Sequence, residues 1–126
     1  QTIVAGFGRA TDGRVGTGRY LSKFANGIHF WSANEDVETT TPLDLGRWQM
    51  LTATYDGQTL RVYKDAVKLA EQKVDLSDDL SQVEVMPKDP WEQERVLDGE
   101  VRDMTIWKQS LSPGQLQILL QAGKAK

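Results

Sequence analysis

The sequence predicts an all-β fold, an antiparallel sandwich or barrel followed by one short C-terminal helix. Two observations predict it. Turn residues recur at short intervals along the 126 residues, and β-branched or aromatic residues fill the stretches between them. Near the C-terminus, apolar residues change to a helical spacing. We expect one domain, residues 1–126, because this length can bury one core and leaves no room for two.

The expected strands are the stretches between turn signals. Asn26-Gly27 and Asp56-Gly57 each lie between two such stretches and predict hairpins, because both positions of a two-residue turn need φ > 0. In order, the expected strands are Thr2–Gly8, Tyr20–Phe24, Ile28–Trp31, Trp48–Tyr55, Leu60–Tyr63, Val67–Gln72, Ser81–Met86 and a last one from about Val96 to Trp107.

Two of these elements carry an irregularity. Asp65-Ala66 lies where a third hairpin turn belongs, and alanine is a poor residue for positive φ, so this turn is either of another type or mildly strained. In the last strand, the apolar alternation changes phase between Val101 and Met104. The change predicts a β-bulge near Arg102–Asp103.

The C-terminal helix has its own start and stop signals. Ser112 is a good N-cap, Pro113 suits the first helical position, and Gln115 completes a capping box. Gly123 is placed to end the helix. The apolar stripe between them consists of Leu116, Leu119 and Leu120.

Composition excludes several classes of function. A net charge of −3 gives no basic footprint, so we expect no nucleic-acid partner. The chain has no cysteine and one histidine, which excludes disulfide scaffolds, thiol nucleophiles and sites built on several histidines. We expect no membrane insertion, because no apolar run approaches about 18 residues. The first residue is Gln1, and the chain opens directly on an apolar run, which suggests a module of a longer chain.

Two stretches resemble a known family. Gly46-Arg47-Trp48, then Ala53-Thr54-Tyr55-Asp56-Gly57 and Leu60-Arg61-Val62-Tyr63-Lys64-Asp65, are similar to a stretch of laminin-G-like, concanavalin A-like jelly-roll domains. Gly99–Trp107, followed by Leu111-Ser112-Pro113 and a leucine-rich helix, is similar to the end of such domains. The resemblance covers residues 19–123 and implies an antiparallel jelly-roll β-sandwich, while the same fold carries lectins, adhesion modules and glycosidases.

The sequence departs from this family in two places. Ala66 follows Asp65 where the family usually has glycine. The family usually has one or two further strands before the position of Thr2, so one sheet is expected either to lack an edge or to receive it from a neighbouring segment. An unpaired apolar edge would promote aggregation.

Catalysis by this chain is not expected. An enzyme of this fold would need two carboxylates at alternate strand positions, and the nearest approach, Glu100 and Asp103, has odd spacing unless the bulge corrects it. Other acidic pairs lie in polar or proline-bounded stretches and are interpreted as solvated charges. A nucleophile triad, a phosphate loop and a zinc motif are missing from the sequence as well.

The aromatic residues are better candidates, because an aromatic face can stack on a sugar ring. With a two-residue turn at Asn26-Gly27, Phe24 pairs with His29, and Tyr20, Phe24, His29 and Trp31 share one face, with Ile28 and Phe30 on the other. A bulged turn would move Phe24 to the second face. The first face is either a ligand platform or half-covered packing, and its candidate ligand contacts are Tyr20, His29 and Trp31.

The other tryptophans divide into two groups. Trp48 and Trp107 lie inside the family motifs and are interpreted as structural. Trp91 lies in a proline-bounded loop and is either a cap over the edge of the sandwich or an exposed ligand contact.

Calcium is the one cofactor to consider, since many domains of the resembled family hold one at the rim of the sheet. The oxygen-rich candidates are Asp12, Asn34 and Asp36, without the dense spacing of a dedicated site.

We therefore expect a non-catalytic module of a secreted or cell-surface protein that binds a carbohydrate or a cell-surface glycan. The alternative is a structural domain that packs against a neighbouring domain or enzyme of the same polypeptide.

Overall fold

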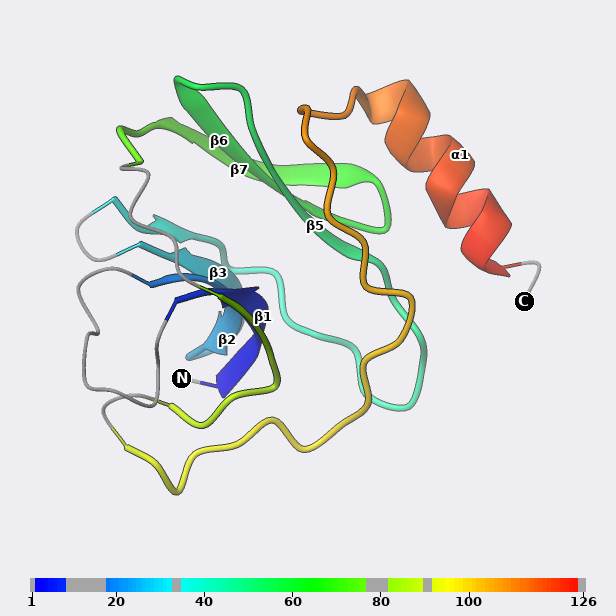
Figure 1. Ribbon diagram of the computed structural model, residues 1–126. Coiled ribbons are helices and arrows are strands. Elements are labelled where there is room, and N and C mark those ends of the chain that lie inside the picture. The colour runs from blue at the N-terminus through cyan, green and yellow to red at the C-terminus, as the bar shows by residue number, and fades with distance from the viewer. Residues whose placement is uncertain (1, 9–17, 33–34, 77–81, 90–91, 125–126) are drawn as a thin grey trace.

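The computed structural model describes residues 2–8, 18–32, 35–76, 82–89 and 92–124. Within these ranges, eight strands form two antiparallel sheets, and one helix follows near the C-terminus (Figure 1). The expected all-β sandwich with a C-terminal helix is therefore confirmed.

The larger sheet has five strands in the order β4-β3-β2-β1-β8. Its strands are β1 (Thr2–Phe7), β2 (Arg19–Phe24), β3 (Gly27–Trp31), β4 (Val37–Glu38) and β8 (Val83–Val85). The strand expected over Ser81–Met86 forms as the shorter β8 and pairs with β1. β1 contains a bulge between Ile3 and Ala5, where its register against β2 shifts.

The smaller sheet has three strands in the order β5-β6-β7. They are β5 (Leu51–Tyr55), β6 (Thr59–Lys64) and β7 (Val67–Lys73). The family motifs place two hairpins here, as expected. At the second hairpin of this sheet, which joins β6 to β7, the turn residues Asp65 and Ala66 have φ of 50° and 63°. Both residues are in the left-handed region, so the alanine carries backbone strain.

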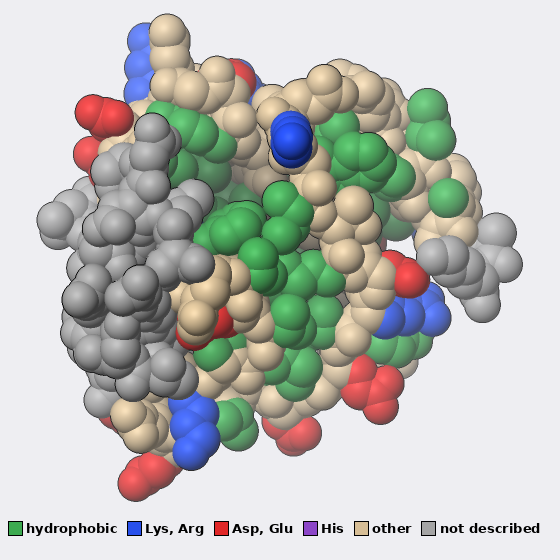
Figure 2. Space-filling model, viewed as in Figure 1, with side chains coloured by type: hydrophobic (Ala, Val, Ile, Leu, Met, Phe, Trp, Pro, Cys, Tyr) green, Lys and Arg blue, Asp and Glu red, His purple; other side chains and the backbone are tan. Residues whose placement is uncertain are grey.

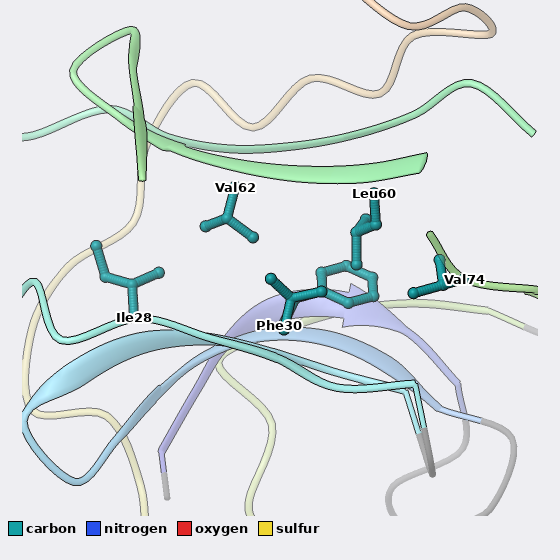
Figure 3. Close-up of a cluster of buried hydrophobic side chains, with 6 residues drawn as sticks. Ile28, Phe30, Leu60, Val62 and Val74 are labelled. Atoms are coloured by element: carbon teal, nitrogen blue, oxygen red, sulfur yellow. The ribbon is translucent and has the colours of Figure 1, made fainter. Parts of the chain in front are cut away.

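The main core lies between the two sheets (Figure 3). Ile28 and Phe30 of β3 point toward Leu60 and Val62 of β6, and Val74 closes one end. Ile28 and Val62 are fully buried, and burial of one such side chain contributes about 1.5–3 kcal/mol. The prediction that Ile28 and Phe30 share a core face is confirmed.

The helix α1 (Pro113–Lys124) packs on the outer face of the smaller sheet. The expected capping box is confirmed: the Ser112 N–H donates to Gln115 Oε1 at 2.8 Å, and the Gln115 N–H donates to Ser112 Oγ at 3.3 Å. Leu116 is fully buried against Tyr63 and Leu111. No helix of the described ranges is long and apolar enough to cross a membrane.

The first hairpin differs from its prediction by two residues. Phe24 pairs with Gly27, so the turn residues are Ala25 and Asn26, and Ala25 has a φ of 49°. The expected Phe24–His29 pair is therefore wrong, and His29 pairs with Ser22 instead. A shift of two residues keeps every side chain on its expected face, because side chains alternate with a period of two.

The strand expected over Val96 to Trp107 does not form, and this segment is coil. Within the part of the chain that the structure describes, this segment joins neither sheet. Alternation of apolar residues becomes a strand only where another strand pairs with it, and no described strand pairs with this segment. Asp103 has a φ of 54°, at the position where the sequence predicts a bulge.

Candidate functional site

The predicted aromatic face exists as one row on the outer face of β2 and β3. Tyr20 pairs directly with Trp31, and their rings stack with centroids 5.8 Å apart and planes at 14°. His29 follows along β3, with its ring centroid 5.3 Å from that of Phe24. Three of the candidate ligand residues therefore lie on one surface.

This row is covered by glycine backbone. A methyl group built on Gly18 would lie 2.2 Å from the Tyr20 ring and 2.7 Å from the Trp31 ring, and one on Gly8 would lie 2.4 Å from the Tyr20 hydroxyl. Such close approach is possible only without a side chain. As a result, Tyr20 is 1% exposed and Trp31 is 7% exposed, so these rings offer almost no free surface to a sugar.

The Tyr20 hydroxyl connects this aromatic row to β8, the edge strand of the larger sheet. It donates to Glu84 Oε2 at 2.8 Å, across the intervening Gly6 of β1. A methyl group on Gly6 would lie 2.1 Å from the Arg19 carbonyl oxygen, so this position also requires glycine. The arrangement is that of a second, smaller core on the outer face, which includes the fully buried Ile3.

His29 lies at the end of this row beside Asp36. Its Nε2 is 3.5 Å from Asp36 Oδ2, and Asp36 Oδ1 accepts a hydrogen bond of 2.8 Å from the Ser32 N–H. Burial lowers the pKa of His29 below its usual 6.5, although the charges of Asp36 and Glu38 oppose this. At neutral pH the ring is therefore uncharged, and it is only 4% exposed.

Three of the predicted site residues, Trp91, Asp12 and Asn34, lie outside the described residues. Asp36 is half-buried and is used by Ser32 and His29, as above. Within the part of the chain that the structure describes, no group of three or more His, Asp or Glu side chains is placed to hold a metal ion. Calcium stays an expectation from the sequence.

Glu100 and Asp103, the acidic pair considered for catalysis, line neither of the two hollows described below. Glu100 and Asp103 are exposed on the coil before α1, and Asp103 lies 3.8 Å from Arg102 Nε. Glu35 and Asp75 border a hollow of about 390 Å³, together with Lys73. The carboxylates of Glu35 and Asp75 therefore line the same concave surface.

A larger cavity of about 480 Å³ lies between the β6–β7 hairpin and the start of α1. Its lining includes Arg61, Tyr63, Lys68, Ser110, Leu111 and Ser112. Tyr63 and Leu111 are buried and form an apolar floor. The cations Arg61 and Lys68 and the hydroxyls of Ser110 and Ser112 line the rest of the cavity.

The charges at this cavity are held in place by ion pairs. Arg61 binds Asp56 at 2.7 Å and Glu71 at 3.0 Å, and Lys68 binds Glu71 at 3.0 Å. The Arg61 hydrogen bond, together with the backbone N–H groups of Thr59 and Gln58, lowers the pKa of Asp56 to about 2. The rim therefore keeps its charges over the whole physiological pH range.

Sequence reasoning missed this cavity. The capping box at Ser112 located the start of the helix, but nothing in the local sequence connects that loop to Arg61 and Lys68. Only the packing of α1 on the smaller sheet brings them together.

Two tryptophans interpreted as structural are half exposed. Trp48 is 49% exposed and Trp107 is 50% exposed. The Arg102 guanidinium lies 4.2 Å from the centroid of the Trp48 ring, a cation–π contact that joins the coil before α1 to the loop before β5.

Comparisons with known proteins agree with this architecture. Residues 2–117 match the family model described as the concanavalin A-like lectin/glucanases superfamily. A search of curated proteins finds no match. The fold is similar to the crystal structure of residues 221–444 of an S-layer domain-containing protein from Clostridium thermocellum, with a TM-score of 0.55 and 20% identity. That match covers 95% of this chain and 62% of the other, so this chain spans less than two thirds of that structure.

Proposed function

The chain belongs to the concanavalin A-like lectin/glucanase superfamily, and from this premise we propose that it is a non-catalytic carbohydrate-binding module of a cell-surface or secreted protein. The superfamily contains both lectins and glucanases. The S-layer domain-containing protein of similar fold supports a location at the cell surface.

The cavity beside α1 is the observation that carries the proposal. Its volume of about 480 Å³ falls within the range of small-molecule sites, about 300–1,000 Å³. Hydroxyl and cationic donors surround an apolar floor, which is the combination that binds the polar edge and the apolar face of a sugar ring. The described lining contains no carboxylate, so it supports binding without glycosidic hydrolysis.

The buried row of Tyr20, His29 and Trp31 is the second location proposed for a glycan. It would open only if Gly8 and Gly18 moved away from the rings. Trp91 stays a candidate contact, and Asp12, Asn34 and Asp36 stay candidate calcium ligands.

A glycan array followed by calorimetry, with and without a chelator, tests the proposal. We expect at least one glycan to bind, and Lys68→Ala to weaken that binding about tenfold. Lys68 is exposed and makes a surface ion pair, so its loss should hardly affect folding. Lys23→Ala removes the same charge from the exposed surface of the other sheet and is the matched control.

Three results would contradict the proposal. The first is no binding to plant, bacterial or animal glycans. The second is release of reducing sugar from a bound glycan, which would make the chain an enzyme. The third is equal loss of binding in Lys68→Ala and Lys23→Ala. Binding that is lost in Trp31→Phe and kept in Lys68→Ala would move the site to the buried row, and binding lost with chelator would support calcium.

One further observation favours the alternative function, a domain that packs against a neighbour. Val83 and Val85 of β8 are 47% and 49% exposed although they face the space between the sheets. If a neighbour normally covers them, the isolated chain should self-associate, and light scattering that shows a stable monomer would count against it.

A further inference from the structure

The capping box of α1 lines one side of the cavity beside this helix. Ser112 Oγ accepts the Gln115 N–H at 3.3 Å, and Gln115 Oε1 accepts the Ser112 N–H at 2.8 Å. Both side-chain oxygens are therefore already used as acceptors by the backbone. What remains for a ligand is the amide NH₂ group of Gln115 and the hydroxyl proton of Ser112, and both of these groups donate.

The cations on the other side of the cavity also have donors to spare. Arg61 of β6 binds Asp56 through Nη1 at 2.7 Å and Glu71 through Nε at 3.0 Å, which leaves the N–H groups of Nη2 without a partner in the described part of the chain. Lys68 of β7 binds Glu71 at 3.0 Å, and its ammonium carries further N–H groups. The two cations can therefore bind a ligand without giving up their ion pairs.

The negative charges that hold these cations lie outside the cavity wall. Asp56 and Glu71 balance the charges of Arg61 and Lys68, but neither carboxylate belongs to the described lining. The first turn of α1 contains no acidic residue, so the positive end of the helix dipole is not offset there. Donors and positive charge are thus in excess at the surface that a ligand would meet.

This excess of donors distinguishes between neutral and acidic sugars. A hydroxyl group of a neutral sugar donates as well as accepts, and a buried donor that finds no acceptor is costly. A carboxylate or a sulfate only accepts, and its hydrogen bonds to Arg and Lys are charge-assisted and stronger. The Ser110 hydroxyl, which can turn to accept, is left for a neutral hydroxyl of the same ring.

The surface as a whole does not supply such a preference. The net charge of the chain is −3. Among the described residues of the face in Figure 2, Lys and Arg side chains are interspersed with Asp and Glu side chains. A broad field of positive charge, which would attract any polyanion, is therefore not present on this face. Selection of an acidic sugar has to come from contacts inside the cavity.

We propose that the cavity beside α1 selects an acidic sugar residue, one that carries a carboxylate or a sulfate group on its ring. The anionic group would lie between Arg61, Lys68 and the start of α1, and the apolar face of the ring would lie on Tyr63 and Leu111. This inference rests on the proposed function, because it names the class of sugar that the same cavity takes.

Matched pairs of glycans test the preference by calorimetry. One pair is a galacturonan oligosaccharide and its methyl ester, and the other is a sulfated galactan oligosaccharide and its desulfated form. Within a pair the ring and the linkage are the same and the charge differs. We expect an acidic member to bind at least tenfold more tightly than its neutral partner, and added salt to weaken that binding. The pair that shows the difference identifies the anionic group as carboxylate or sulfate.

A matched pair of variants locates the anionic group. Gln115→Glu keeps the capping box, because a carboxylate also accepts the Ser112 N–H, and a negative charge suits the start of a helix. The fold should therefore be retained, while the affinity for the acidic glycan falls at least tenfold and that for its neutral partner stays within threefold. Gln117→Glu makes the same change at an exposed residue outside the lining and should leave both affinities within threefold.

The results that would overturn this inference differ from those that would overturn the proposed function. Equal or tighter binding of the neutral members contradicts selection of an acidic sugar and leaves a carbohydrate-binding module in place. An acidic preference that Gln115→Glu does not reduce, or that both variants reduce equally, would show that the anionic group does not lie at this cavity. Absence of binding to every glycan, acidic or neutral, would contradict the proposed function itself.

Discussion

The two halves of the larger sheet have the same strand pairing but different cover. Over β2, β3 and β4 the smaller sheet lies on the inner face, and Phe30 and Val37 are buried. Over β8 the inner face is open, since Val83 and Val85 are about half exposed, while Ala5 and Phe7 of β1 are partly buried. The outer face shows no such difference, since Tyr20 and Trp31 of β2 and β3 and Glu84 of β8 are all buried. The open half is therefore held mainly from its outer face, where the Tyr20 hydroxyl donates to Glu84.

The largest expected change in the free energy of unfolding comes from a core substitution in the covered half. Phe30→Ala should lower the free energy of unfolding by about 3–5 kcal/mol, because it removes a buried ring and leaves a cavity between the sheets. Val85→Ala in the open half should cost less than about 1 kcal/mol, because much of that side chain is already in water. Urea unfolding of both variants measures the difference, and equal losses would show that the two halves are equally covered.

The next effect tests how the open half is held. Tyr20→Phe should lower the free energy of unfolding by about 1–3 kcal/mol, because the hydroxyl donates to a buried carboxylate. The control is Tyr55→Phe in the smaller sheet, where the hydroxyl donates to the Val74 carbonyl oxygen at 3.2 Å. It should cost about 1 kcal/mol or less. If Tyr20→Phe cost no more than its control, Glu84 would not anchor β8.

A smaller effect depends on pH. Burial lowers the pKa of His29 below 6.5 in the folded state, so the unfolded chain binds a proton first as the pH falls. The contribution of His29 is complete above pH 6.5 and declines below it, until the pH passes the folded pKa. The slope is at most about 1.4 kcal/mol per pH unit. Unfolding measured from pH 7.5 to 5 should show this decline, and His29→Gln should reduce it; an unchanged slope in the variant would contradict this reading.

The smallest effect concerns the first hairpin, which lies at the covered end. Ala25→Gly should raise the free energy of unfolding by about 1 kcal/mol, because glycine adopts a φ of 49° without the strain of alanine. Thermal unfolding checks the gain. Asn26→Gly, at a turn residue without positive φ, is the control and should not stabilise; a gain there equal to that of Ala25→Gly would refute the strain.

Local patterns predicted much of the fold. The capping box at Ser112 and the alternation around Ile28 and Phe30 depend on neighbours in sequence, and both predictions are confirmed. In the first hairpin the turn lies one residue earlier than the Asn26-Gly27 signal predicts, which changes the strand register by two residues. Val96–Trp107 has strand alternation, but no described strand pairs with it, and a local pattern does not reveal whether a partner strand is in place.

The candidate site was harder to predict for the same reason. Tyr20 and Trp31 were placed together correctly, but their cover by Gly8 and Gly18 comes from outside the hairpin. The cavity beside α1 joins Lys68 to Ser110 through packing of the helix. Burial and cavities are products of tertiary packing, so residue spacing alone does not predict them.

The contrast between the two halves is tested most directly by thiol accessibility, since the natural chain contains no cysteine. Val62→Cys and Val85→Cys make the same change in the closed core and on the open inner face, where the valines are 0% and 49% exposed. With a thiol reagent under native conditions, V85C should react nearly as fast as the unfolded chain, and V62C at least a hundredfold more slowly. Equal, slow reaction of both variants would contradict an open inner face at β8.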